Sequence, residues 1–264
     1  MRFKLTLRIS KEGQRAILPI NYQYPVSSWI YKVLNSGNSE FTQWLHTNGY
    51  KDGNKQFRLF NFSRILVKYF NIKEDRMIIK QPEISLYISF YPIETLGHFI
   101  TGLFKNQECT IGDNKSQASF TVQAVEKLPE PYFHPNVTFK TLSPLLISHK
   151  ETPAQKYATY KHLEEEDYGQ LFINNLITKY NAFYTLQDID KCIDKRTVHA
   201  GFKLLNTPKS NLISIKSGTQ NESKLKAYSF QFQLIASEPF IRFGYYAGFG
   251  EKNSLGFGCV KYEV

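Results

Sequence analysis

The feature that most constrains the fold is an order of strand and helix patterns that occurs twice along the chain. Between residues 1 and 130, apolar residues alternate or follow helical spacing in the order β-α-β-β-α-β. The proline-marked segment Pro129 to Pro135 has no such period and is typical of a linker. The same order restarts at residue 136. The sequence therefore predicts an α+β protein of two tandem ferredoxin-like domains, residues 1–130 and 136–264.

In the first half, Pro25 stands at a plausible first position of a helix, where proline is favoured, and this helix ends near Gly37. A short second helix is predicted around Phe41 to Leu45, and a third over residues 93–103. The apolar stripe of the first helix consists of Trp29, Ile30, Val33 and Leu34. The predicted strands are residues 3–9, 58–66, 84–91 and 118–125.

In the second half, residues 163–180 are a predicted helix with the acidic run Glu164 to Asp167 in its first turn. Negative charge there is stabilised by the helix dipole. Four consecutive carboxylates point around a helix and do not converge, so this run does not predict a metal site. A short turn or helix is expected over residues 239–245. The predicted strands are residues 137–147, 199–215, 228–234 and 257–262.

The charge balance favours a polyanionic partner. The chain has 33 Lys and Arg against 23 Asp and Glu, a net charge of +10, which is typical of proteins that bind nucleic acid or an acidic membrane surface. No apolar stretch is long enough for a membrane span. The first nine residues alternate charge and hydrophobe, which argues against a secretory signal and predicts a cytoplasmic protein. The three cysteines (Cys109, Cys192, Cys259) lie too far apart for a zinc site or a disulfide scaffold.

The most specific motif is a glycine-rich segment over residues 248–258. It reads Gly-Phe-Gly-Glu-Lys-Asn-Ser-Leu-Gly-Phe-Gly. Glycines let a backbone approach a ligand closely and present N–H donors to phosphate oxygens. The segment has neither the Walker nor the Rossmann spacing. A glycine-rich turn without a ligand is the alternative interpretation.

This motif resembles the signature of the CRISPR repeat-RNA processing endoribonucleases, and the resemblance covers nearly the whole chain. Further similarities are the Met1-Arg-Phe3 start, the Tyr22-Gln-Tyr24 stretch, the spacing from Tyr31 to His46, and Thr141-Leu-Ser-Pro144 at the beginning of the second half. The resemblance implies two domains like RNA-recognition modules that cut CRISPR repeat RNA without a metal or other cofactor. It also implies a 2′,3′-cyclic phosphate (or 3′-phosphate) and a 5′-hydroxyl as product ends.

The family's catalytic set is a tyrosine on the first helix, a following histidine and a lysine, which Tyr31, His46 and Lys55 match. Helical geometry places Tyr31 and His46 away from the apolar faces of their helices, so both are expected to be accessible. Lys51 remains an alternative to Lys55. A histidine titrates near neutral pH and suits either direction of proton transfer. We favour His46 as base, Tyr31 as the group that orients or activates the 2′-hydroxyl, and Lys55 as the charge that neutralises the phosphate, and the sequence leaves the swapped roles of His46 and Tyr31 open.

RNA binding is expected to use the glycine-rich segment and basic residues of both halves, and lysines 209, 216, 224 and 226 flank a predicted hairpin that could grip phosphates. The candidate RNA-binding residues are Arg242, Gly248, Gly250, Lys252, Asn253, Ser254, Gly256 and Gly258. Two other functions remain open: a non-cleaving repeat-RNA subunit of a CRISPR ribonucleoprotein complex and a generic tandem RNA-binding or anionic-ligand module. Other subunits of an effector complex are possible partners, and the sequence leaves monomer and homodimer open.

Overall fold

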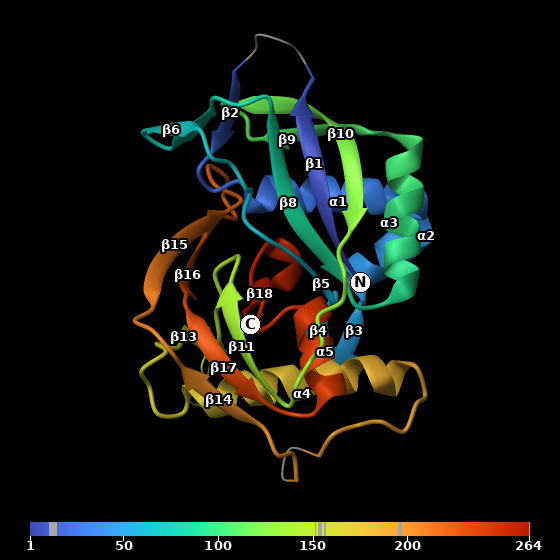
Figure 1. Ribbon diagram of the computed structural model, residues 1–264, viewed down its shortest axis with the longest axis vertical. Coiled ribbons are helices and arrows are strands. Elements are labelled where there is room, and N and C mark those ends of the chain that lie inside the picture. The colour runs from blue at the N-terminus through green and yellow to red at the C-terminus, as the bar shows by residue number, and fades with distance from the viewer. Residues whose placement is uncertain (11–14, 151, 153–154, 156, 195–196, 264) are drawn as a thin grey trace.

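The computed structural model describes residues 1–10, 15–150, 152, 155, 157–194 and 197–263. It places two antiparallel sheets one above the other, each covered by helices (Figure 1). The strands of the first sheet lie within residues 2–127 and those of the second within residues 136–263. This arrangement confirms the tandem ferredoxin-like fold class, while the domain boundaries at 130 and 136 stay a prediction.

The first sheet has the strand order β5-β8-β1-β10-β9. Without the edge strand β9, the neighbouring strands of this sheet are the second, third, first and fourth in chain order. This is the ferredoxin-like arrangement. Helices α1 and α3 pack together, with Trp29 of α1 edge-on to Phe99 of α3. The bounds are β1 (Arg2–Ile9), α1 (Gln23–Gly37), β5 (Phe60–Phe62), β8 (Glu83–Phe90), α3 (Ile93–Lys105), β9 (Glu108–Gly112) and β10 (Gln117–Lys127).

The second sheet repeats this arrangement in the order β14-β17-β11-β18. Helix α4 connects its first two strands and α5 its last two. Phe172 of α4 packs against Phe232 of β17, and Tyr180 packs against Phe243 of α5. The bounds are β11 (Asn136–Thr141), α4 (Tyr168–Leu186), β14 (Gly201–Leu204), β17 (Gln231–Ile235), α5 (Glu238–Ala247), the 3-10 turn η1 (Asn253–Leu255) and β18 (Val260–Glu263).

Several short elements are inserted into this scaffold. Helix α2 and a small hairpin follow α1, a three-stranded sheet of order β2-β7-β6 flanks the first sheet, and two further hairpins belong to the second half. Their bounds are β2 (Ala16–Pro19), α2 (Ser39–Thr47), β3 (Tyr50–Asp52), β4 (Lys55–Phe57), β6 (Phe70–Lys73), β7 (Arg76–Ile79), β12 (Ser148–His149), β13 (Thr159–Tyr160), β15 (Lys209–Ile215) and β16 (Ser223–Ser229).

Most predicted elements are confirmed, and the differences have local causes. The first helix begins at Gln23, two residues before Pro25. The strand expected over 58–66 forms a continuous ladder only at Phe60–Phe62, with an isolated bridge from Leu66 to Ser85, and the strand expected over 228–234 is divided into β16 and β17 at Phe230. The break at Phe230 occurs where the chain leaves one sheet for another, a choice made by tertiary packing and not by alternation.

The prediction for the acidic run was wrong. Helix α4 begins at Tyr168, so Glu164 to Asp167 precede it and none lies in its first turn. Lys161 instead forms ion pairs with Glu165 at 2.9 Å and Asp167 at 3.1 Å. Charge pairing within the turn replaces the expected interaction with the helix dipole.

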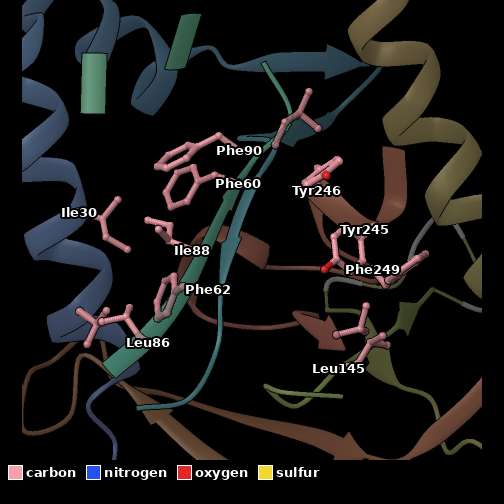
Figure 2. Packing of buried hydrophobic residues seen from close by; sticks show 14 of the residues in the cluster. Ile30, Phe60, Phe62, Leu86, Ile88, Phe90, Leu145, Tyr245, Tyr246 and Phe249 are labelled. Carbon is pink, nitrogen blue, oxygen red and sulfur yellow. The ribbon is translucent and has the colours of Figure 1, made fainter. Parts of the chain in front are cut away.

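One continuous core joins the two halves. Figure 2 shows Phe60 and Phe62 on the side of the first sheet that faces Ile30 of α1. Tyr245 and Phe249 of the second half lie on the other side of the sheet. Arg2 is buried between the halves, donates to Ser89 Oγ of the first and to the carbonyl oxygens of Tyr245 and Val260 of the second, and lies 3.6 Å over the Tyr245 ring. These contacts fix the orientation of the two sheets.

Candidate catalytic site and RNA interface

Tyr31 and His46 are brought together by the packing of α1 against α2. Asn38 caps α2 by accepting a hydrogen bond from the Phe41 N–H at 2.9 Å, so the chain turns directly from one helix into the next. The rings of Tyr31 and His46 lie edge to face with centroids 5.8 Å apart. His46 is exposed as predicted, and Tyr31 is half-buried. Two of the three predicted catalytic residues are therefore neighbours.

The Tyr31 phenol lies in a partly desolvated position, with its ring edge-on to Phe60 at 5.6 Å. Burial raises the pKa of Tyr31 above its ordinary value, while the charge of Arg58 and hydrogen bonds to the side chains of Ser254 and Arg58 oppose that rise. Because the net pKa shift is upward, the phenol is protonated near neutral pH. Tyr31 is thus equipped to donate a hydrogen bond.

Arg58 is a member of this site that the sequence analysis missed. Its Nη2 donates to the backbone oxygen of His46 at 2.5 Å and to Gln56 Oε1 at 3.2 Å. These contacts hold the Arg58 guanidinium at the backbone of His46, and its charge is close enough to Tyr31 to oppose the rise that burial causes in the pKa of the phenol. The feature of the sequence that could have identified Arg58 is its position directly after the strand that carries Lys55.

Lys55 and Lys51 both lie exposed on the β3–β4 hairpin. Lys51 Nζ donates to Asn48 Oδ1 at 2.9 Å. Lys55 is close enough to the buried Lys179 of α4 that its positive charge lowers the pKa of Lys179. The β3–β4 hairpin thus brings Lys55 close to the second half. The choice of Lys55 as a catalytic residue stays a prediction.

A cavity of about 490 Å³ opens between α1 and α2. Tyr31 and His46 form part of its wall. The other lining residues are Ser28, Lys32, Asn35, Ser36, Thr42, Gln43 and Thr47. Hydroxyl, amide and ammonium groups can bind phosphate, ribose and base atoms, so the cavity suits a nucleotide next to the reacting phosphate.

The glycine-rich loop, residues 248–258, connects α5 to β18. Its four glycines all have positive φ. A Cβ on Gly258 would lie 1.8 Å from the Phe249 oxygen, and one on Gly256 would lie 2.7 Å from the Phe62 ring. Close packing within the protein therefore explains these glycines, and direct RNA contacts at Gly248, Gly250, Gly256 and Gly258 stay predictions.

The three polar residues of this loop have different environments. Lys252 is exposed, whereas Asn253 is 8% exposed and donates from Nδ2 to the oxygens of Phe249 and Phe257 at 2.8 and 3.1 Å. The Ser254 oxygen accepts a 2.7 Å hydrogen bond from Ser27 of α1. The loop of the second half thus reaches the helix that carries Tyr31.

Arg242 and the lysine hairpin complete the predicted RNA surface. Arg242 is 43% exposed and forms ion pairs with Glu130 and Glu238, each at 3.0 Å, so an RNA phosphate would compete with two carboxylates. The four lysines at 209, 216, 224 and 226 are exposed on or beside β15 and β16. Asn211 of β15 accepts from Arg64 Nη2 at 2.5 Å, which holds this hairpin against the first half.

The remaining candidate groups do not form a second site in the described part of the chain. No cluster of three His, Cys, Asp or Glu side chains suited to a metal occurs there. The three cysteines are free, with Cys109 and Cys259 buried. Among the described helices, none has the length and apolar character needed to cross a membrane.

Comparison with known proteins agrees with this arrangement. The family model described as CRISPR associated protein Cas6, C-terminal, matches residues 127–262, more than half of the chain. The model described as CRISPR-associated protein Cas6, N-terminal, matches residues 17–126. The chain belongs to the Cas6 family. The resemblance seen in the glycine-rich motif is thereby confirmed.

Cas6 relatives match nearly the full length. "CRISPR-associated endoribonuclease Cas6 1" of Methanocaldococcus jannaschii is 28% identical over 97% of this chain and 92% of its own length. "CRISPR-associated endoribonuclease Cas6" of Pyrococcus furiosus is 28% identical over 100% of this chain and 90% of its own length. A solved structure titled "CRISPR associated protein Cas6" is 27% identical with a TM-score of 0.77, covering 100% of this chain and 99% of that one. Another, titled "An RAMP protein binding different RNA substrates", is 26% identical with a TM-score of 0.79 and full coverage of both chains.

Proposed function

We propose that this protein is an endoribonuclease that cleaves CRISPR repeat RNA in precursor transcripts to release guide RNAs. The observation that carries the proposal is the pairing of Tyr31 with His46, next to Arg58, which donates to the backbone oxygen of His46. The two relatives described above are named endoribonucleases, and the net charge of +10 suits an RNA substrate.

The reaction uses a nucleophile that RNA supplies itself. A base takes the proton of the 2′-hydroxyl, the oxygen forms a bond to the adjacent phosphorus, and the bond from phosphorus to the 5′-oxygen breaks. The departing oxygen takes a proton from an acid. The products are a 2′,3′-cyclic phosphate, which can open to a 3′-phosphate, and a 5′-hydroxyl. Each step can be served by side chains, so the proposed reaction is independent of metal.

The environments of the side chains support a division of roles. His46 is exposed, and a positioned imidazole can accept a proton as a general base must. Tyr31 is held in its protonated form by burial, which favours donation to the substrate over removal of a proton. Arg58, and Lys55 from the same hairpin, would stabilise the extra negative charge of the pentavalent phosphate.

We further propose that repeat RNA runs from the site across the glycine-rich loop and the lysine hairpin, with Lys252 and the four hairpin lysines on its phosphates. Such a substrate places the enzyme in the cytoplasm, where the transcript is made. Other subunits of a CRISPR effector complex are candidate partners. Both a monomer and a homodimer are compatible with this function.

The test is cleavage of an end-labelled repeat RNA by the full chain in EDTA. We expect cleavage with the product ends given above, and none when a single deoxyribose replaces the ribose at the cut position. Binding of the RNA without any cut would favour the non-cleaving subunit instead. A requirement for magnesium, or equal cutting of an all-DNA strand, would overturn the mechanism.

A further inference from the structure

A lysine lies where lysines are rarely found, in the interior of the second half. Lys179 of α4 is 1% exposed. Its ammonium donates to the oxygens of Gly248 and Gly250 at 2.6 and 2.7 Å and to Asn253 Oδ1 at 2.6 Å. An ammonium has three N–H donors, and all three are used. A buried charge is costly unless it is fully paired, so this geometry needs an explanation.

The three acceptors all belong to the glycine-rich loop. Lys179 binds the loop at its beginning and at Asn253, and Asn253 in turn donates to Phe249 and Phe257 on both arms of the loop. The loop's own large hydrophobic side chains, Phe249 and Phe257, are buried in the surrounding core, so these polar contacts hold the centre of the loop. Lys179 and Asn253 therefore determine the shape of the loop.

The loop shaped in this way touches the proposed catalytic site. Ser254 follows Asn253 directly, and its backbone oxygen accepts from Ser27 of α1 at 2.7 Å. Its side chain lies close enough to Tyr31 to oppose the rise that burial causes in the pKa of the phenol. On its other side, the Lys179 ammonium lies 5.9 Å from the centre of the Phe57 ring, in the strand β4 that carries Lys55. Burial is the main cause that lowers the pKa of Lys179 to about 7, with Glu251 opposing it and Lys55 adding to it.

We infer that Lys179 is a positioning residue for RNA cleavage: it holds the glycine-rich loop so that Ser254 orients the Tyr31 hydroxyl. The inference rests on the proposed function. Lys179 itself touches neither Tyr31 nor the substrate, and its effect passes through Asn253 and Ser254. A small displacement of a catalytic group reduces the rate steeply, so a buried residue of this kind can control the chemistry.

The first experiment measures the cleavage rate at saturating enzyme for Lys179→Met, which keeps the length of the side chain and removes its three donors. We expect a loss of about 100-fold, the size typical of a misplaced catalytic group. Lys191→Met, an exposed lysine just after α4, is the matched control and should cleave at the rate of the unmodified chain. The melting temperature of each variant is measured alongside.

The second experiment distinguishes positioning from general stability by combining variants. Because the effect passes through Tyr31, Lys179→Met should change the rate far less in a Tyr31→Phe background than in the unmodified chain. An equal loss in both backgrounds would overturn the inference. If Lys179→Met does not fold, Ser254→Ala provides the same comparison, since it removes only the hydroxyl next to Tyr31.

The outcomes also separate this inference from the proposed function. If the unmodified chain does not cut repeat RNA, the proposed function fails. If it cuts and Tyr31→Phe is impaired, while Lys179→Met and Ser254→Ala cleave normally, the proposed function stands and the role of Lys179 is wrong.

Discussion

The two halves of the molecule share one strand order and differ in the connection between the second helix and the last strand. In the first half this connection forms β9, which pairs with β10 and extends the sheet at its edge. In the second half the same connection is the glycine-rich loop, which turns inward and binds α1 of the first half through Ser254 and Ser27. The same connection thus extends the sheet in the first half and contacts the other half in the second. This agrees with the general rule that function is carried by the connections of a shared fold.

A second difference lies after the first helix of each half. In the first half the chain adds α2 and the β3–β4 hairpin, which carry His46 and Lys55 and lead to Arg58. In the second half the first helix, α4, supplies Lys179 to the glycine-rich loop. The proposed chemistry therefore belongs to the first half, and the second half holds it in place. The predictions below test this division.

The largest effect is expected for His46→Ala. Loss of a general base typically reduces a rate by about 100-fold to 10,000-fold, so we expect a loss of about 1,000-fold in single-turnover cleavage. RNA affinity should be unchanged, because His46 contributes no permanent charge to phosphate binding. His134→Ala, in the segment between the two sheets, is the control and should cleave normally. Full cleavage by His46→Ala would remove the histidine from the mechanism.

The next prediction tests the glycine-rich loop by comparing alanine substitutions at two glycines that have nearly the same φ. Gly258 has φ of 72° and Gly218, in the turn of the lysine hairpin, has φ of 73°. Alanine at Gly218 meets nothing within 4 Å, so only backbone strain of about 1 kcal/mol is expected. Alanine at Gly258 would also collide with the Phe249 oxygen, and we expect a loss of about 3 kcal/mol or more. Urea unfolding of both variants measures the difference, and equal losses would show that the loop can relax.

A third prediction concerns which cation of the first half serves the phosphate. Arg58→Ala should reduce single-turnover cleavage by about 100-fold, the loss typical of removing one group that stabilises transition-state charge. Arg58→Lys should recover only part of the rate, since an ammonium cannot bind Tyr31 and the His46 oxygen with a planar fork. Lys55→Ala is the comparison on the same hairpin. A larger loss for Lys55→Ala than for Arg58→Ala would restore the lysine as the main cation.

Much of this could be predicted from the sequence, because it depends on local periodicity. The stripe through Trp29, Ile30, Val33 and Leu34 is buried as expected, and the same helical geometry predicted the exposed position of His46, whereas Tyr31 is half-buried. The family followed from one glycine-rich motif. These signals are contained in neighbouring residues, so a single chain reveals them.

What the sequence did not reveal depends on contacts between distant segments. Arg58 meets His46 across 12 positions, and Lys179 meets Asn253 across 74. Asn253 was predicted to face RNA, yet its side chain is occupied by Lys179, Phe249 and Phe257. A lysine within a helical pattern normally indicates a solvated face, and only the folded arrangement shows that Lys179 is buried.

The smallest effect is expected for the lysine hairpin of the second half, where phosphate contacts change affinity more than rate. Single-stranded RNA releases about 0.7 counterions for each phosphate that a protein neutralises. The double variant Lys224→Ala and Lys226→Ala should therefore lower the slope of log affinity against log salt by about 1.4, with little change in the cleavage rate at saturation. Lys105→Ala with Lys191→Ala, at the end of α3 and in the segment after α4, is the charge-matched control. An unchanged slope for the hairpin variant would show that the RNA takes another path, and that the second half contributes its loop alone.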